Sequence, residues 1–179
     1  MKEKIRKEIE LPDQTTIEIN ETIKLTGPQG TVEKKLFHPK IKIYQQENKV
    51  IIEAEKATKK EKKILHSFFS HLKNMIKGVN ELHVYKLKIC SGHFPMNVSV
   101  SNNQLIIKNF FGESVPRKLT IKPGAQVKVE GSEIIVTSAS KEIAGQVAAD
   151  IEQLTRIKNR DRRIFQDGCY IINKDGKEI

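Results

Sequence analysis

The sequence repeats one pattern at a spacing of 82 to 84 residues, and this repeat limits the possible folds more than any other feature. A strand segment, a hairpin segment and a helix start recur in the same order: 32–36 with 115–119, 49–52 with 133–136, and 58–59 with 140–141. A nearly constant register across three different elements indicates two copies of one fold. Chance similarity between short β patterns is the competing explanation. We favour duplication and predict two domains, 1–82 and 83–179.

The first copy contains short alternating segments followed by one amphipathic helix. Apolar and polar residues alternate in several short runs between residues 9 and 37, and 41–52 has the pattern of a hairpin. Thr58 and Glu61 have the spacing of a helix capping box. We expect Gly78 to end this helix. Its core-facing stripe consists of Ile64, Leu65, Phe68, Leu72, Met75 and Ile76.

The second copy follows the same order and adds a C-terminal segment. Alternating segments between residues 85 and 136 predict strands, and Ser140 is a suitable N-cap for a second amphipathic helix. We expect this helix to fray near residues 157–158 and a strand to begin at Ile164. Asp167 and the glycine after it have the composition of a tight hairpin turn.

Together these patterns predict the fold class. The chain should be an α+β protein made of two tandem, similar domains that arose by internal duplication. Each domain should hold an antiparallel β-sheet with one packed α-helix. Copies of about 90 residues have a usual size for small domains, and 37% hydrophobic with 30% charged residues fits a globular protein with a heavily charged surface.

The net charge restricts the class of partner. The chain carries 32 Lys and Arg against 22 Asp and Glu, which gives a net charge of +10 and an isoelectric point near 9.5. Such a balance favours an anionic partner, with nucleic acid first and an acidic membrane next. No apolar run approaches the roughly 18 residues of a membrane span, and the start of the sequence is charged rather than apolar. We therefore expect a cytoplasmic protein without a membrane partner.

Arginine is concentrated between residues 156 and 163. Both copies have a net charge of +5, but the first contains one Arg and the second five. Because guanidinium matches phosphate with two parallel hydrogen bonds, we predict that this stretch binds a polyanion, with Asp161 and Asp167 orienting its arginines. The alternative is that cations complete a helix C-terminus, which would explain Arg156 and Lys158 only. The predicted contacts are Arg156, Lys158, Arg160, Arg162 and Arg163.

Two loops of the second copy add weaker candidates. His93 and Phe94 lie on the first long loop, where an aromatic ring can stack on a base. Residues 110 and 111 are both Phe, and we expect them to close the end of their own sheet. With no Trp and three Tyr, the chain has few stacking platforms, so recognition of phosphates and shape, as in double-stranded RNA, fits best. The weaker candidate contacts are His93, Arg117 and Lys118.

The residues needed for catalysis or metal binding do not occur together. Cys90 and Cys169 stand alone, without the paired short spacings of a zinc site, and we expect buried apolar thiols rather than a disulfide. A phosphate-binding glycine loop, a nucleophile elbow and clustered acids are all missing from the sequence. We therefore predict no enzyme activity, no metal, no cofactor and no small-molecule substrate.

Several short segments of the sequence resemble motifs of a known family. Segments 74–79, 92–97, 109–113 and 153–174 are similar to recurring motifs of the large-subunit ribosomal protein six family, in its archaeal and eukaryotic branch. The motifs follow the family order over nearly the whole chain. Cys169 departs from the family pattern, which usually has an aliphatic residue there.

The resemblance implies a fold and a partner. It implies two duplicated domains, each with a β-sheet and one helix. It also implies binding to large-subunit ribosomal RNA, chiefly through the second domain, near the base of the lateral stalk and the region where translation factors engage. Arg160, Arg163 and Lys174 are the cations that match the family motif.

The sequence thus favours a structural constituent of the large ribosomal subunit. Its expected partners are large-subunit (23S-type) ribosomal RNA and neighbouring ribosomal proteins. The alternative is an RNA-binding or chaperone-like module that acts off the ribosome. An enzyme acting on RNA is a third hypothesis, for which the sequence offers no base, metal or nucleophile in one cluster.

Overall fold

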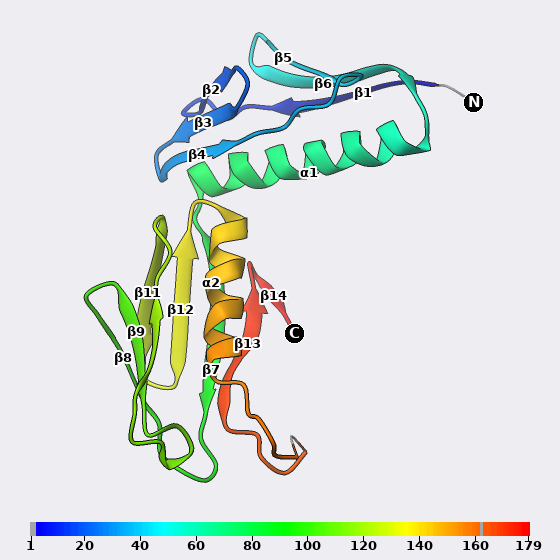
Figure 1. Cartoon of the computed structure of the whole chain (residues 1–179). Coiled ribbons are helices and arrows are strands. Elements are labelled where there is room, and N and C mark those ends of the chain that lie inside the picture. Colours follow the sequence, from blue (N-terminus) through cyan, green and yellow to red (C-terminus); the bar gives the residue numbers. More distant parts are fainter. Residues whose placement is uncertain (1–2, 162) are drawn as a thin grey trace. The chain divides into compact units, whose positions relative to one another are not determined.

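The chain, seen here as a computed structural model, is described for residues 3–161 and 163–179. It separates into two compact units, Met1–Leu82 and His83–Ile179, which we call unit 1 and unit 2 (Figure 1). In the described part of the chain each unit combines antiparallel sheets with one α-helix. The predicted α+β fold class is therefore confirmed.

Unit 1 is formed by two sheets and a long helix. Its elements are β1 (Glu3–Glu10), β2 (Thr16–Ile19), β3 (Ile23–Gly27), β4 (Gly30–Lys34), β5 (Lys42–Gln46), β6 (Lys49–Ala57) and α1 (Lys59–Asn80). The strand order is β1-β6-β5 in one sheet and β2-β3-β4 in the other. Strands β5 and β6 form the predicted hairpin, in which Gln46 pairs with Lys49 and Lys42 with Glu53.

Helix α1 begins and ends through side chains that bind its own backbone. The Thr58 hydroxyl accepts a hydrogen bond from the N–H two residues on at 3.3 Å, and the Glu61 carboxylate accepts one from the Thr58 N–H at 2.9 Å. The predicted capping box is confirmed. Gly78 does not end the helix: it is buried within it, and the Asn80 side chain donates to a carbonyl of the last turn at 2.8 Å. Because Asn80 satisfies this terminal carbonyl, no glycine is needed as a stop.

Loss of the capping box should weaken unit 1 in a pH-dependent manner. Thr58→Ala should lower the free energy of unfolding by about 1 kcal/mol. Hydrogen bonds from the Thr58 hydroxyl and N–H, and from Lys40, lower the pKa of Glu61 from 4.5 to about 2. Since the pKa is lower in the folded state, the Glu61 contribution is complete above about pH 4.5 and is lost as the pH falls toward 2. Thermal unfolding of wild type and Glu61→Gln should therefore differ at pH 7 and converge near pH 2; an equal difference at both pH values would contradict this assignment.

Unit 2 repeats the architecture of unit 1 and extends it. Its elements are β7 (His83–Cys90), β8 (Asn97–Ser101), β9 (Gln104–Lys108), the 3-10 turn η1 (Phe110–Gly112), β10 (Arg117–Thr120), β11 (Ala125–Glu130), β12 (Glu133–Ser138), α2 (Lys141–Leu154), β13 (Gly168–Lys174) and β14 (Lys177–Glu178). The order β11-β12-β7 repeats β5-β6-β1, and β10-β9-β8 repeats β4-β3-β2. Strands β13 and β14 continue the larger sheet beyond β7 and have no counterpart among the described residues of unit 1.

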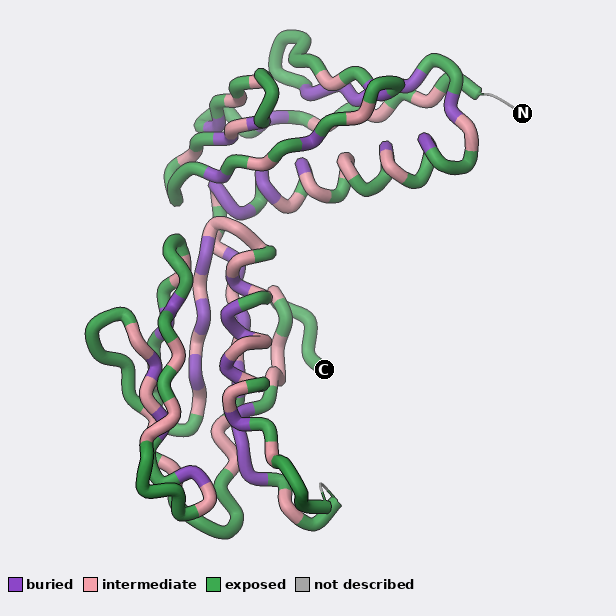
Figure 2. Tube along the Cα trace, in the orientation of Figure 1, coloured by how far each residue is buried: buried purple, intermediate pink, exposed green. Residues whose placement is uncertain are grey.

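The core of each unit lies between its helix and its strands. In unit 1, Leu65 and Leu72 of α1 and Val50 of β6 are completely buried. In unit 2, Ile151 of α2 and Leu87 of β7 belong to one buried cluster. Figure 2 shows buried positions recurring along one side of each helix, as the apolar stripes in the sequence predicted.

The segment after α2 differs from the sequence prediction in its boundaries. Helix α2 ends at Leu154, before the predicted fraying at 157–158, and β13 begins at Gly168 rather than at Ile164. Asp167 is buried and does not form a hairpin turn with the glycine that follows it, because that glycine already pairs with the end of β7. The described residues between 155 and 167 therefore form one long connection between α2 and β13.

Thr155 explains why the helix stops early. Its hydroxyl donates to the Glu152 carbonyl at 3.2 Å and accepts from the Cys169 N–H at 2.9 Å. The side chain thus satisfies a helix-terminal carbonyl and joins the helix end to β13. This contact spans 14 positions, so the local helical pattern could not reveal it.

Candidate nucleic-acid interface

Three connections lie at one end of unit 2: residues 91–96 after β7, 109–116 after β9 and 155–167 after α2 (Figure 1). We call this surface the loop end. Most of the described residues of segment 156–164 are exposed (Figure 2), and Asp167 is buried. The loop end therefore combines an open outer surface with a fixed base.

Asp167 fixes the first of these connections to the third. Its buried carboxylate accepts hydrogen bonds from the N–H groups of Gly92 and His93, the second at 3.2 Å, and lies 2.7 Å from Nδ1 of the His93 ring. Burial alone would raise the pKa of Asp167, but the hydrogen bonds from Gly92 and His93 outweigh it and hold the pKa below its usual value. Asp167 thus orients the His93 loop, where the sequence suggested that it would orient an arginine.

An aromatic ring from each connection contributes to a second link. The His93 ring centroid lies 4.9 Å from that of Phe165 and 6.0 Å from that of Phe111, and the two phenylalanine rings are 5.8 Å apart. Phe110 is buried in the core and Phe111 packs against it, as predicted for this pair. His93 keeps 39% of its side chain exposed, but its ring already takes part in this packing and in the hydrogen bond with Asp167.

Three of the predicted cations are exposed on the outer surface of the loop end. Arg156 and Lys158 follow directly after the helix, and the structure gives their side chains no ion pair among the described residues. The Arg160 guanidinium lies 5.5 Å from the centroid of the Phe165 ring. This contact restricts Arg160 without neutralising its charge.

Arg163 is exposed but has a carboxylate partner. Its Nη2 lies 2.7 Å from Oδ2 of Asp161, with 89% of the Arg163 side chain and 40% of the Asp161 side chain exposed. Hydrogen bonds from the Arg163 side chain and N–H lower the pKa of Asp161. Because solvent screens such a pair, a phosphate can compete for Arg163. Arg162, which was also predicted to bind, lies outside the described residues.

The end of α2 bears on the alternative role of Arg156 and Lys158, which is to complete the helix C-terminus. The last turn of α2 contains no basic residue, and among the described residues no hydrogen bond joins the Arg156 or Lys158 side chain to a helix carbonyl. Arg117 of β10 makes such a bond instead, since its Nη1 donates to the Leu154 carbonyl at 2.5 Å. Its other nitrogens donate to Glu113 at 2.8 and 2.6 Å. Arg117 is therefore engaged within unit 2 rather than available as a surface cation.

The two remaining candidates lie apart from the cluster. Lys118 is exposed but alternates with Arg117 along β10, so it points to the other face of that sheet. Lys174 pairs with Tyr85 at the opposite end of β13 from Gly168. Six residues of strand separate it from the loop end, a distance of about 20 Å. The structure thus brings Arg156, Lys158, Arg160, Arg163 and His93 together at the loop end, holds Arg117 there in internal hydrogen bonds, and leaves Lys118 and Lys174 apart.

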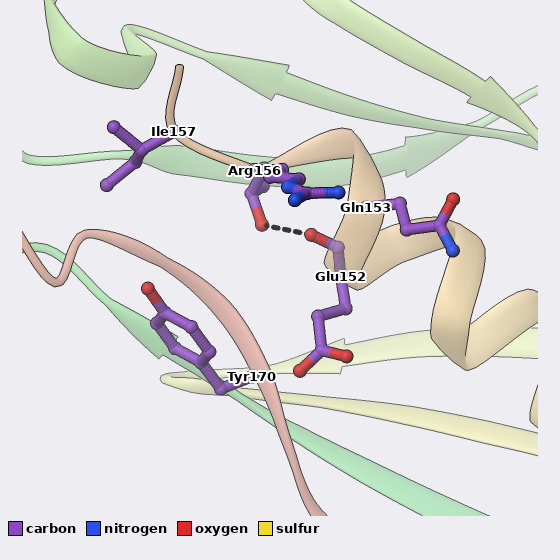
Figure 3. Close-up of a pocket in the computed structure, with 6 residues that line it drawn as sticks. Glu152, Gln153, Arg156, Ile157 and Tyr170 are labelled. Carbon is purple, nitrogen blue, oxygen red and sulfur yellow. Dashed lines mark hydrogen bonds between the residues drawn. The ribbon is translucent and has the colours of Figure 1, made fainter. Parts of the chain in front are cut away.

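A hollow of about 460 Å³ adjoins the cations at the end of α2. Figure 3 shows Glu152 and Gln153 on the last turn of the helix, Arg156 and Ile157 on the segment that follows, and Tyr170 on β13. One Glu152 carboxylate oxygen accepts a hydrogen bond from the Ile171 N–H of β13 at 3.3 Å. The hollow therefore has an acidic wall, an aromatic wall and a basic rim.

The described residues offer no arrangement for metal chemistry. Among them, no three His, Cys, Asp or Glu side chains are placed to hold a metal ion, and no helix is long and apolar enough to cross a membrane. Both cysteines are free thiols, Cys90 half-buried and Cys169 buried. Burial raises the pKa of Cys169 to about 12, so this thiol stays protonated.

Sequence reasoning missed the residues that assemble the loop end. The sequence suggests a turn and an arginine-orienting role for Asp167, and it assigns no binding role to Phe165 or Tyr170. Asp167 and Gly92 are 75 positions apart, and they meet because Gly168 pairs with Cys90 in neighbouring strands. A prediction that β13 pairs with β7 would have revealed this contact, but local patterns do not specify strand partners.

Comparison with known proteins identifies the family. A family model described as ribosomal protein L6 matches residues 11–82 and 94–168, one segment in each unit. The chain is 44% identical over 177 residues to the large ribosomal subunit protein uL6 of Methanococcus vannielii, covering 98% of this chain and 97% of the relative. It is 43% identical over 184 residues to the protein of the same name from Nanoarchaeum equitans, covering 98% and 96%. The chain therefore belongs to the ribosomal protein L6 family, in its archaeal type.

Proposed function

We propose that this protein is a structural constituent of the large ribosomal subunit and binds large-subunit ribosomal RNA through the loop end of unit 2. Family membership supports the ribosomal role and assigns the chain to structural proteins rather than enzymes. As a ribosomal protein it would act in the cytoplasm. Its partners would be the RNA and neighbouring ribosomal proteins.

One observation carries the RNA part of the proposal. Four described cations, Arg156, Lys158, Arg160 and Arg163, project from one connection whose base is fixed by Asp167 and by packed aromatic rings. Because this base is already ordered, the connection loses little conformational entropy when it binds. Exposed guanidinium groups on such a support suit the phosphates of a folded RNA.

The contacts of these four cations are expected to recognise phosphate and shape rather than sequence. Arg160 is restricted by the Phe165 ring, and Arg163 can exchange Asp161 for a phosphate. The finer location, on 23S-type RNA near the stalk base and the factor-binding region, rests on the family resemblance. Hydroxyl-radical footprinting of the RNA with and without the protein would test this location.

Co-sedimentation separates this proposal from a module that acts off the ribosome. A structural constituent should remain in the large subunit at one copy per particle after a high-salt wash. The small subunit from the same preparation is the control. If the protein washes off or sediments with neither subunit, the ribosomal assignment fails, and RNA binding in solution would then favour the off-ribosome module.

A further inference from the structure

We propose that the hollow between the end of α2 and β13 binds a single unpaired nucleobase extruded from the ribosomal RNA. This inference rests on the proposed function, because the hollow adjoins the cations of the loop end at Arg156. Its volume of about 460 Å³ lies within the range of ligand pockets. Sequence-specific RNA recognition usually targets such splayed-out bases.

The acidic wall indicates a base rather than a phosphate. The Glu152 carboxylate faces the hollow and is held in place by the N–H of Ile171. A carboxylate would repel a phosphate but accepts hydrogen bonds from the amino groups of adenine, cytosine or guanine. The ligand that complements this wall is therefore an N–H donor without negative charge.

Donor groups stand beside this acceptor. The Gln153 side-chain amide has no hydrogen-bond partner among the described residues, and it can both donate to and accept from a base edge. The Arg156 guanidinium lines the same hollow. A base inside the hollow would place its own phosphate near the rim, where Arg156 and Lys158 follow the helix. The base would thus meet the Glu152 carboxylate, and its phosphate would meet the cations Arg156 and Lys158.

Tyr170 supplies a flat surface for stacking. Its residue surface is 40% exposed, and its ring lines the hollow from β13, across from Ile157 (Figure 3). Loss of such a stacking contact typically lowers affinity by roughly 5- to 150-fold. The competing occupant is a peptide segment from another protein. A peptide would not present the planar edge of a base to the Glu152 acceptor and to the Gln153 and Arg156 donors.

The test uses the chain of 179 residues and protein-free large-subunit ribosomal RNA. Tyr170→Ala should lower the affinity by roughly 5- to 150-fold without changing the slope of affinity against salt, because a base contact releases no counterions. Tyr170→Phe should bind like wild type. The matched control is Tyr44→Ala in unit 1, where the tyrosine is 36% exposed, and it should have no effect on binding. Unchanged affinity of Tyr170→Ala would overturn the inference.

Ultraviolet crosslinking of the wild-type protein provides a second measurement that does not depend on the folding of a variant. In assembled subunits, the peptide containing Tyr170 should crosslink to one unpaired nucleotide. A crosslink of Tyr170 to another ribosomal protein would overturn the inference. Failure of the wild type to bind the RNA at all would instead refute the proposed function.

Discussion

Changing Arg156, Lys158, Arg160 and Arg163 together to glutamine should lower the affinity for large-subunit ribosomal RNA by about 1,000-fold at 0.1 M salt. All four side chains are exposed on one connection of unit 2. Each phosphate contact releases counterions equivalent to a slope of about 0.9 in log affinity against log salt. Four contacts would therefore account for about three to four units of slope. Filter binding over a range of salt concentrations measures both quantities.

A variant with the same change in charge serves as the control. Lys59, Lys62, Lys63 and Lys73 are exposed on α1, and changing these four to glutamine also removes four positive charges. If total charge alone attracted the RNA, both variants would lose affinity equally. A loss confined to the unit 2 variant would support the loop end as the site, and an equal loss would refute it.

Asp167→Ala should weaken both unit 2 and its binding to RNA. The buried carboxylate accepts hydrogen bonds from Gly92 and His93, and bonds to a charged group each contribute about 1.5–3 kcal/mol. We expect the free energy of unfolding to fall by about 2–4 kcal/mol, since the effects of neighbouring bonds do not add fully. Denaturant unfolding measures this loss. Affinity for the RNA should fall as well, because loop 91–96 and the Phe165 ring lose their support.

The direction of the binding change makes this prediction discriminating. Asp167→Ala removes a negative charge, so long-range attraction alone would strengthen binding to RNA. Asp161→Ala makes the same charge change at an exposed site and frees Arg163. It should bind at least as tightly as wild type and unfold at a similar temperature. Tighter binding by Asp167→Ala would show that its contacts do not shape the interface.

Acid should reproduce part of the effect of Asp167→Ala. The pKa of Asp167 is lower in the folded protein than its ordinary value of 3.8, so its contribution is complete above about pH 4 and is lost as the pH falls below the folded value. Unfolding temperatures of wild type and Asp167→Ala should therefore converge in strong acid.

The fold could be predicted because local patterns and the repeat agree with each other. The capping box at Thr58 and Glu61 and the β5–β6 hairpin depend on residues close in sequence, and both occur as expected. In unit 2 the β11–β12 hairpin and an N-cap at Ser140 recur at offsets of 84 and 82 residues, although the N-cap has no capping box. Consistency between local preference and overall pattern is what makes such predictions dependable.

The sequence predicted which cations the candidate site contains but not the long-range contacts that hold the site together. The cations of 156–163 were evident from the concentration of arginine. Arg117 also looked like a surface cation, but it meets the carbonyl of Leu154, 37 positions away. The stop of α2 at Thr155 likewise depends on Cys169 in the next strand. Contacts of this kind are set by strand pairing, which short sequence patterns do not encode.

The unequal length of the two repeats means that the two units do not offer the same surface to a partner. Unit 1 ends its repeat with α1, whereas unit 2 continues past α2 through residues 155–167 into β13. The segment that we assign to RNA therefore has no counterpart among the described residues of unit 1. Doubling the repeat alone would therefore not double the proposed RNA site, because the two units share a body but not the segment that carries the cations.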